Sequence, residues 1–248
     1  MEAIYDQIGL DYSVQRCTDS RIAKQLNESL KGATRIINIG AGTGSYEPTD
    51  VPLVAVEPSA EMIAQRKPGS HPVKQATAEQ LPFANNSFSH AMTILSMHHW
   101  QNKVQAFNEI NRVVTQKFVT ITWDPEAKPF WLTRDYFPEI HEMDIQIFPT
   151  IEELKKHFDQ VIAKPLFVPH DCRDGFFAAF WRRPEAYLSE KVRKSMSPFA
   201  KVNNLTAGLQ KLKADLEDGS WQKKNKSILN SASLDVGYKI VTAKVSSL

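Results

Sequence analysis

The apolar residues of this chain fall either into short continuous runs or at helical spacing. The runs at 36–39, 53–56, 87–95, 118–123, 161–168 and 236–245 predict β-strands. Helical spacing at 19–31, 59–66, 106–114, 150–158, 184–199 and 205–217 predicts α-helices. Because strands and helices alternate over the first half of the chain, we expect an α/β fold with a Rossmann-like, doubly wound and mostly parallel sheet.

Two stretches interrupt this alternation. The pattern breaks into an aromatic-rich connection at 124–149, and 67 residues, 169–235, separate the last two strands. A hairpin would need only a few residues there, so we expect a helical cap over one end of the sheet and an antiparallel last strand. The expected organisation is a core of residues 1–173 and 233–248, of which 1–31 form an N-terminal lid and helix, with the cap at 174–232 inserted before the last strand.

One strand-turn-strand segment is the most informative part of the chain. The apolar run 36–39 leads into Gly40-Ala41-Gly42-Thr43-Gly44, and the run 53–56 ends at Glu57. Glycines let the turn bend sharply and admit a ligand against bare backbone, and a carboxylate at the end of the neighbouring strand suits a ribose diol. The segment therefore predicts a site for an adenosine-containing ligand.

The glycine spacing argues against a dinucleotide as that ligand. A dinucleotide site requires Gly-x-Gly-x-x-Gly, and Ser45 stands at the third glycine position. An NAD-dependent oxidoreductase is therefore the lowest-ranked of the alternative functions.

Five segments together resemble the class I S-adenosylmethionine-dependent methyltransferases. They are 36–44, 54–59 with Met62, 76–83, 87–100 and 109–113, in this order within residues 36–123. The nearest subgroup looks like the small-molecule methyltransferases related to ubiquinone and menaquinone biosynthesis enzymes. The resemblance implies S-adenosyl-L-methionine as cofactor and methyl transfer to a small organic acceptor by in-line displacement.

The resemblance also implies a set of cofactor-binding residues. By position they are Gly40, Ala41, Gly42 and Gly44 at the methionyl end, Glu57 with Pro58 at the ribose, Thr77, Ala78 and Glu79 around the adenine, and Leu95 and Ser96 beside the sulfonium. Tyr12 and Arg16 belong to the N-terminal lid, and their spacing of four places both on one helical face toward the cofactor carboxylate. For Arg16 a surface salt bridge is the alternative.

The chain departs from the family pattern in its first crossover. Gly44 and Leu53 are separated by eight residues, among them Pro48 and Pro52, where the family has a full helix. We expect a short turn or an extended crossing instead. Asn38 and Thr77 also replace common acidic residues of the family. These departures motivate a second hypothesis, a cofactor-binding regulatory or partner protein without turnover.

His98 and His99 are the candidate catalytic residues. They follow the strand at 87–95, and a neutral histidine can act as a general base toward a methyl acceptor. Anchoring of the loop by hydrogen bonds is the alternative role. Methyl transfer from a sulfonium requires no metal, and Cys17 and Cys172 have neither zinc-site nor Cys-x-x-Cys spacing.

The aromatic residues of the cap leave two interpretations open. Those within 130–148, together with Phe176, Phe177, Phe180 and Trp181, either wall an apolar acceptor pocket or form the core between cap and sheet. Both interpretations place them near one end of the sheet. The sequence does not choose between them.

Charge and hydropathy narrow the class of partner. The net charge is +2 and the pI about 8.4, although residues 182–226 hold eleven Lys or Arg against five Asp or Glu. A nucleic-acid methyltransferase therefore ranks low, because no RNA-binding module accompanies this basic stretch. No signal peptide or membrane span is expected, which favours a cytoplasmic protein with a small-molecule acceptor. The oligomeric state is left open.

Overall fold

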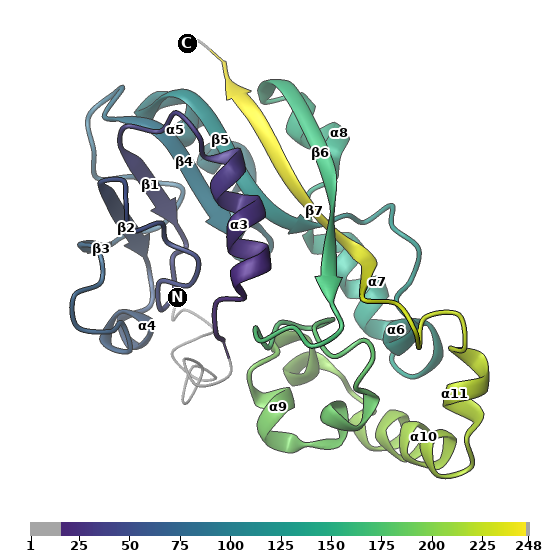
Figure 1. The fold of residues 1–248 in the computed structure, drawn as a ribbon. Helices are drawn as coiled ribbons and strands as arrows, with labels where there is room; N and C mark the ends of the chain where they lie inside the picture. Colours follow the sequence, from purple (N-terminus) through teal and green to yellow (C-terminus); the bar gives the residue numbers. More distant parts are fainter. Residues whose placement is uncertain (1–15, 247–248) are drawn as a thin grey trace.

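Seven strands form a single twisted sheet in the order β3-β2-β1-β4-β5-β7-β6 (Figure 1). The computed structural model describes residues 16–246. The strands are β1 (Ile36–Ile39), β2 (Leu53–Glu57), β3 (Val73–Gln75), β4 (Phe88–Ile94), β5 (Val114–Trp123), β6 (Phe158–Pro169) and β7 (Ser233–Val245). Neighbours from β3 to β5 run parallel, and β7 runs antiparallel to both β5 and β6. The doubly wound sheet with an antiparallel last strand is confirmed.

Helices lie on both faces of the sheet and beyond one of its ends. The helices are α3 (Ser20–Ser29), α4 (Ala60–Ala64), α5 (Lys103–Val113), α6 (Trp131–Asp135), α7 (Pro138–Ile147), α8 (Ile151–Lys155), α9 (Glu190–Lys194), α10 (Leu205–Glu217) and α11 (Ser220–Lys224), with 3-10 turns η1 (Met97–His99), η2 (Pro184–Leu188) and η3 (Ser197–Lys201). Asp19 caps α3, and Thr150 with Glu153 forms the expected capping box of α8. These local signals fix where both helices begin.

The alternation of side chains along the strands divides the core in two. On β1, Ile36 packs into the cluster that holds Ile22 and Leu26 of α3, whereas Ile37 and Ile39 pack into the cluster beneath α5. Each of these large side chains, almost fully buried, contributes roughly 1.5–3 kcal/mol to stability. The sheet is therefore covered on both faces, which leaves its strand ends as the exposed site for a ligand.

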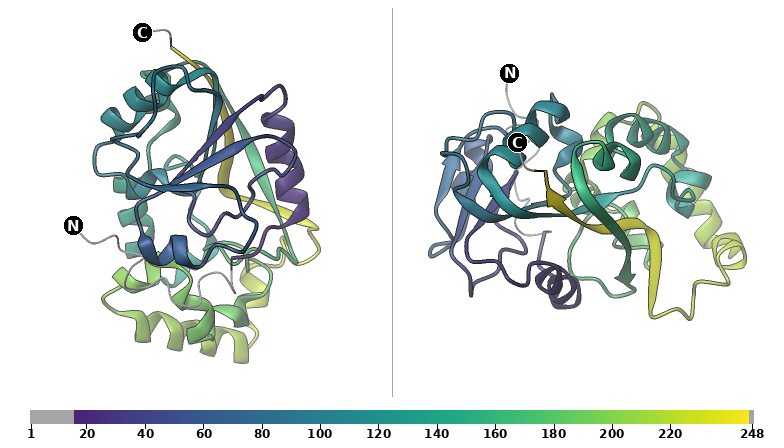
Figure 2. Two further views of the ribbon diagram at one scale, coloured as in Figure 1. Left: turned by 90° about the vertical axis from the view of Figure 1, so that its left-hand side faces the viewer. Right: turned by 90° about the horizontal axis from the view of Figure 1, so that it is seen from above.

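The helices α6, α7 and α9 to α11 gather beyond the carboxyl ends of the parallel strands (Figures 1 and 2). Trp131 and Trp221 meet edge to face there, and the indole nitrogens of Trp131 and Trp181 donate to the carbonyls of Trp181 and Val168. Gly208 of α10 packs so closely against Phe137 that a Cβ would lie 2.2 Å from its ring. These aromatic residues belong to the same cluster as α3, so core and helices share one continuous interior.

The structure differs from the sequence predictions in five segments. Residues 124–149, expected as a connection, contain α6 and α7. The expected helix 184–199 is divided into η2, α9 and η3, and Pro198 accounts for the break between α9 and η3, because proline cannot continue an α-helix. The expected helix 150–158 ends at Lys155 and β6 begins at Phe158. Strand β3 and helix α11 are additional elements that the apolar pattern does not reveal.

Candidate active site

A cavity of about 410 Å³ lies at the carboxyl ends of β1, β2 and β4, and we call it the larger cavity. This volume is within the range of ordinary ligand sites, about 300–1,000 Å³. The predicted site residues that line it are Arg16, Gly40, Ala41, Gly42, Glu57, Pro58, Thr77, Ala78, Glu79, Leu95, Ser96, His98 and His99. Tyr12 lies outside the described residues. The structure thus brings five separate segments of the sequence into one cavity.

Gly40 is the residue at which the strand turns into the cavity. Its φ is +66°, and a Cβ built on it would lie 1.8 Å from Oγ of Ser96. The amides of Gly40 and Ala41 both donate to the carbonyl of Val56, at 2.9 and 3.0 Å. Any side chain at position 40 would push the turn away from β4, so bare backbone is required to form this wall of the cavity.

The carboxylate of Glu57 is held in place by backbone amides. One oxygen accepts from the amide of Gly42 at 2.8 Å and the other from the amide of Ser59 at 3.0 Å. Ser59 in turn caps α4 through the amide of Met62. A carboxylate oxygen can accept more than one hydrogen bond, so both oxygens retain the capacity to bind a pair of ligand hydroxyls.

At the opposite end of the cavity, Thr77, Ala78 and Glu79 form the wall predicted for the adenine. The carboxylate of Glu79 accepts from the amides of Gln101 and Asn102, at 2.8 and 3.2 Å. Glu79 therefore holds the segment that enters α5 while lining the cavity. Its role includes fixing this wall in position.

The short first crossover contains no helix between Gly40 and Pro52, as its length and prolines predict. A buried ion pair takes the helix's place: Nη2 of Arg66 lies 2.7 Å from Glu47, and both side chains are about 5% exposed or less. Nη1 of Arg66 donates to the carbonyl of Gly42, and Nδ2 of Asn38 donates to Glu47. Gly44 is not among the residues lining the cavity, because its Cα faces Arg66, 2.9 Å from where a Cβ would lie.

Arg16 forms an ion pair, as its alternative role required, but the pair is nearly buried and does not lie on the surface. Its Nε lies 2.6 Å from the carboxylate of Asp174, in a nearly buried ion pair, and its side chain lines the larger cavity. The same carboxylate accepts from the hydroxyl of Tyr46 at 3.0 Å. Asp174 thus joins the N-terminal segment, the first crossover and the start of the 174–232 region.

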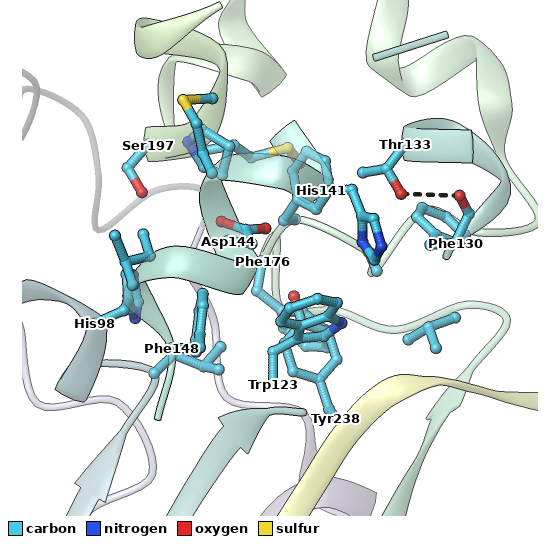
Figure 3. Close-up of a pocket in the computed structure, with 18 of the residues that line it drawn as sticks. His98, Trp123, Phe130, Thr133, His141, Asp144, Phe148, Phe176, Ser197 and Tyr238 are labelled. Atoms are coloured by element: carbon cyan, nitrogen blue, oxygen red, sulfur yellow. Dashed lines mark hydrogen bonds between the residues drawn. The ribbon is translucent and has the colours of Figure 1, made fainter. Parts of the chain in front are cut away.

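A smaller cavity of about 80 Å³ adjoins the larger one on the side of the cap. The two cavities share Arg16, Leu95, His98 and Lys201. Figure 3 shows Trp123, Phe148, Phe176 and Tyr238 around this space, with His98 on one side and His141 on the other. Leu95, at the junction, has a φ of +49°, a strained conformation that costs roughly 1–3 kcal/mol in a non-glycine residue and is concentrated at functional sites.

His98 and His99 occupy different chemical settings at this junction. The ring of His98 stacks on Phe148 with centroids 4.2 Å apart and lines both cavities, whereas His99 lines only the larger one. Burial lowers the pKa of His98 well below its usual range and that of His99 to about 4, so both are neutral at pH 7. Nδ1 of His98 is buried without a hydrogen-bond partner in the described part of the chain.

Two charged residues of the smaller cavity have no counterpart in the sequence analysis. Asp144, on α7, points into the cavity, and Lys201, at the end of η3, lines both cavities (Figure 3). Burial raises the pKa of Asp144 to about 7, and nearby Lys201 partly opposes that shift. A helix prediction for 138–147 would have placed Asp144 one turn from His141, but no local pattern shows which face is covered.

Over residues 16–246, no cluster of three or more His, Cys, Asp or Glu has the arrangement of a metal site. Within the described residues, neither Cys17 nor Cys172 forms a disulfide bond. None of the helices in that range is long and apolar enough to cross a bilayer.

Comparison with known proteins shows that this chain is similar to methyltransferases. A family model for a methyltransferase domain matches residues 37–118. The chain is 33% identical to a proposed methyltransferase from an antibiotic biosynthesis pathway of Anabaena variabilis, with a TM-score of 0.83, covering 92% of this chain and 98% of that one. This match spans the cap as well as the sheet.

Two more distant proteins extend the comparison. Geranyl diphosphate C-methyltransferase from Streptomyces coelicolor, solved with S-adenosyl-L-homocysteine, shares the fold at 14% identity and a TM-score of 0.52, covering 92% of this chain and 76% of that one. The tRNA (carboxymethyluridine(34)-5-O)-methyltransferase of Schizosaccharomyces pombe is 27% identical over 169 residues, 65% of this chain and 71% of that protein.

Proposed function

Because this chain belongs to the class I S-adenosylmethionine-dependent methyltransferases, we propose that it methylates a small organic acceptor held in the smaller cavity. The observation that carries the proposal is the junction of the two cavities at Leu95 and His98. The smaller cavity is walled by aromatic side chains, as small-molecule sites usually are. An acceptor there would lie next to the cofactor and be shielded from water.

The larger cavity fits the cofactor, S-adenosylmethionine, which supplies a methyl group already activated by a sulfonium. We propose that the carboxylate of Glu57 accepts hydrogen bonds from the two ribose hydroxyls, and that the turn Gly40–Gly42 lies along the methionyl part of the cofactor. Asn38 supports this assignment, because it lines the cavity and its buried Oδ1 has no donor among the described residues. The amino group of the cofactor is a donor that would satisfy it.

We propose that His98 receives a proton from the acceptor and that His99 helps to hold the cofactor side of the loop. Methylation makes a proton on the acceptor more acidic, so a neutral imidazole of low pKa is a sufficient base. The stacked position of His98 on Phe148 orients its ring toward the shared boundary. The contribution of the remaining residues is to position the two molecules in line.

The finer assignments are also proposals. The order of the five sequence segments supports a subgroup related to ubiquinone and menaquinone biosynthesis enzymes, and the two cysteines, which lack the spacing of a disulfide framework, support a cytoplasmic location. The S. pombe relative favours a second candidate, methylation of tRNA, in which the basic stretch 182–226 would contact phosphates.

Calorimetry and labelled methyl transfer test these functions together. We expect S-adenosylhomocysteine to bind, NADH not to bind, and labelled methyl groups to appear in one or more members of a metabolite panel. The His98→Asn variant should bind S-adenosylhomocysteine normally and lose about 10²–10⁴-fold in rate. Tight cofactor binding with no transfer to the panel, or transfer to tRNA alone, would refute the small-molecule proposal.

A further inference from the structure

We propose that Asp144 makes the smaller cavity a recognition site for an acceptor that carries a basic nitrogen, an inference that rests on the methyl-transfer function proposed above. The basic nitrogen is the group by which the acceptor is held. The atom that receives the methyl group is a separate question. Four features of the described residues support this substrate class.

The first feature is the setting of the Asp144 carboxylate. It projects from α7 into the cavity between Ser197 and Phe176 (Figure 3). Within residues 16–246 its oxygens accept no hydrogen bond and form no ion pair. A partly buried carboxylate without a partner lowers the stability of the folded protein. A carboxylate in this setting on a cavity wall is therefore suited to pair with a cationic group of a ligand.

The second feature is the aromatic surface around that carboxylate. Trp123, Phe148, Phe176 and Tyr238 line the same cavity, and Trp123 meets Phe148 edge to face at 5.7 Å. Aromatic faces attract ammonium and similar cations by roughly 0.5–2 kcal/mol each, most strongly where water is excluded. A carboxylate together with such faces recognises a protonated amine better than an alcohol or an acid.

The third feature is the disposition of the other charges that face Asp144. Arg16 is already bound to Asp174 at 2.6 Å, and burial keeps His98 neutral. His141 lies on the same helix, and its Nδ1 has no partner among the described residues. These groups leave Asp144 as the one carboxylate lining this cavity in the described chain.

Lys201 is the residue that could reverse the selectivity. Lys201 is exposed at the end of η3 and lines both cavities. Its Nζ lies more than 4.0 Å from the Asp144 carboxylate, so the two residues form no ion pair. Because it also borders the larger cavity, we assign it to the cofactor carboxylate. An acidic acceptor would instead form an ion pair with Lys201, and its negative charge would be repelled by the carboxylate of Asp144.

The fourth feature is the ionisation of Asp144, which supports the geometry. Burial raises its pKa to about 7, so the empty cavity holds the carboxylate partly protonated at neutral pH. A bound cation favours the ionised form. Amine binding should therefore strengthen between pH 6 and pH 8. The other groups facing Asp144 are His98, His141, Tyr238, Lys201 and Arg16, and they are present in the cavity for every ligand whose affinity is compared.

Three ligands that share one ring test the proposal: benzylamine, benzyl alcohol and benzoate. They are titrated by calorimetry into the full chain saturated with S-adenosylhomocysteine at pH 8. We expect benzylamine to bind about 10- to 100-fold more tightly than the other two, as one charge-assisted contact provides. Asp144→Asn should remove this preference and Asp144→Glu should retain part of it.

Glu142→Gln is the matched control, because Glu142 lies exposed on the same helix and does not line the cavity. Unchanged affinity for S-adenosylhomocysteine shows that each variant is folded. The inference is overturned if wild-type protein binds benzylamine no more tightly than benzoate, or if Asp144→Asn keeps the preference. In the former case Lys201→Met is expected to abolish benzoate binding, assigning the cavity to acids.

Methyl transfer is measured separately from binding, so the two proposals can fail independently. Benzylamine binding that depends on Asp144, without labelled methyl transfer to any acceptor tested, upholds recognition of a basic nitrogen by this cavity and refutes the proposed function. Transfer only to neutral or acidic acceptors upholds the proposed function and refutes this inference.

Discussion

The two adjoining cavities are built in opposite ways. The larger one is formed by backbone at the ends of β1 and β2, and its key side chain, Glu57, is bound by the amides of Gly42 and Ser59. The smaller one is formed by side chains from α6, α7, η3 and β7. Three polar groups of residues that line it, His98 Nδ1, His141 Nδ1 and the Asp144 carboxylate, lack partners in the described chain, whereas in the larger cavity Asn38 Oδ1 is the corresponding case.

Under the proposed function, the larger cavity holds the cofactor and the smaller one the acceptor. A site whose key side chain is already held by backbone amides binds its ligand without rearrangement. A site with unsatisfied polar side chains is stabilised by the ligand that completes them. The variants below alter one cavity or its support and ask whether the other is affected.

The largest effect is expected where a buried ion pair replaces the missing crossover helix. Arg66→Met leaves the Glu47 carboxylate buried without its guanidinium, which should lower the free energy of unfolding by about 3–5 kcal/mol. Denaturant unfolding measures this. The exposed neighbour provides the control, since Lys67→Met should change stability by less than about 0.5 kcal/mol. Equal stability of the two variants would show that the crossover does not depend on the pair.

Gly40→Ala should damage the larger cavity directly. The left-handed φ and the overlap with Ser96 each cost roughly 1–3 kcal/mol, so S-adenosylhomocysteine should bind about 100-fold more weakly by calorimetry. Gly69→Ala is matched in backbone conformation, with a φ of +83° and no described atom within 4 Å of its Cβ. Normal ligand binding by Gly40→Ala would contradict the assignment of this turn.

Glu57→Gln tests the ribose assignment with less disturbance. The amide retains one acceptor oxygen, so S-adenosylhomocysteine should bind about 10- to 100-fold more weakly, as expected for loss of charged hydrogen bonds. Wild-type protein should also prefer this ligand over its 2′-deoxy analogue, and the variant should not. Glu61→Gln, on α4 beyond the cavity lining, serves as control. A variant that still discriminates the 2′-hydroxyl would place the ribose elsewhere.

The larger cavity could be anticipated because its signals are local. Gly40, Gly42 and Glu57 stand at strand ends that the apolar runs define, and Pro48 and Pro52 exclude a crossover helix. The support of that turn could not be anticipated, because Arg66 reaches Glu47 and Gly42 only after folding. The resemblance, rather than composition or periodicity, supplied the cofactor's identity.

The smaller cavity was predicted only in outline, since it depends on contacts between distant segments. The segment that forms α7 was predicted to be an irregular connection because it is rich in aromatic residues. Pro138 stands in the first turn of this helix, where proline is typical, but the prediction did not use this signal. An acidic residue such as Asp144 in a mixed helix normally faces solvent, so its direction is decided by packing against Phe176 and η3.

The smallest expected effect concerns the stability cost of the unpartnered carboxylate. With a pKa of about 7 in the folded chain against an ordinary value near 3.8, Asp144 ionises less readily when folded, so its contribution to stability falls as pH rises from about 4 to 7. Asp144→Asn should therefore be more stable than wild-type protein at pH 8 by about 1–3 kcal/mol, and the difference should vanish below about pH 4. Thermal unfolding across this range measures it, with Glu142→Gln as control. A variant less stable than wild type at pH 8 would mean that Asp144 already has a partner within the protein, such as Lys201, and that the contrast between a satisfied and an unsatisfied cavity does not hold.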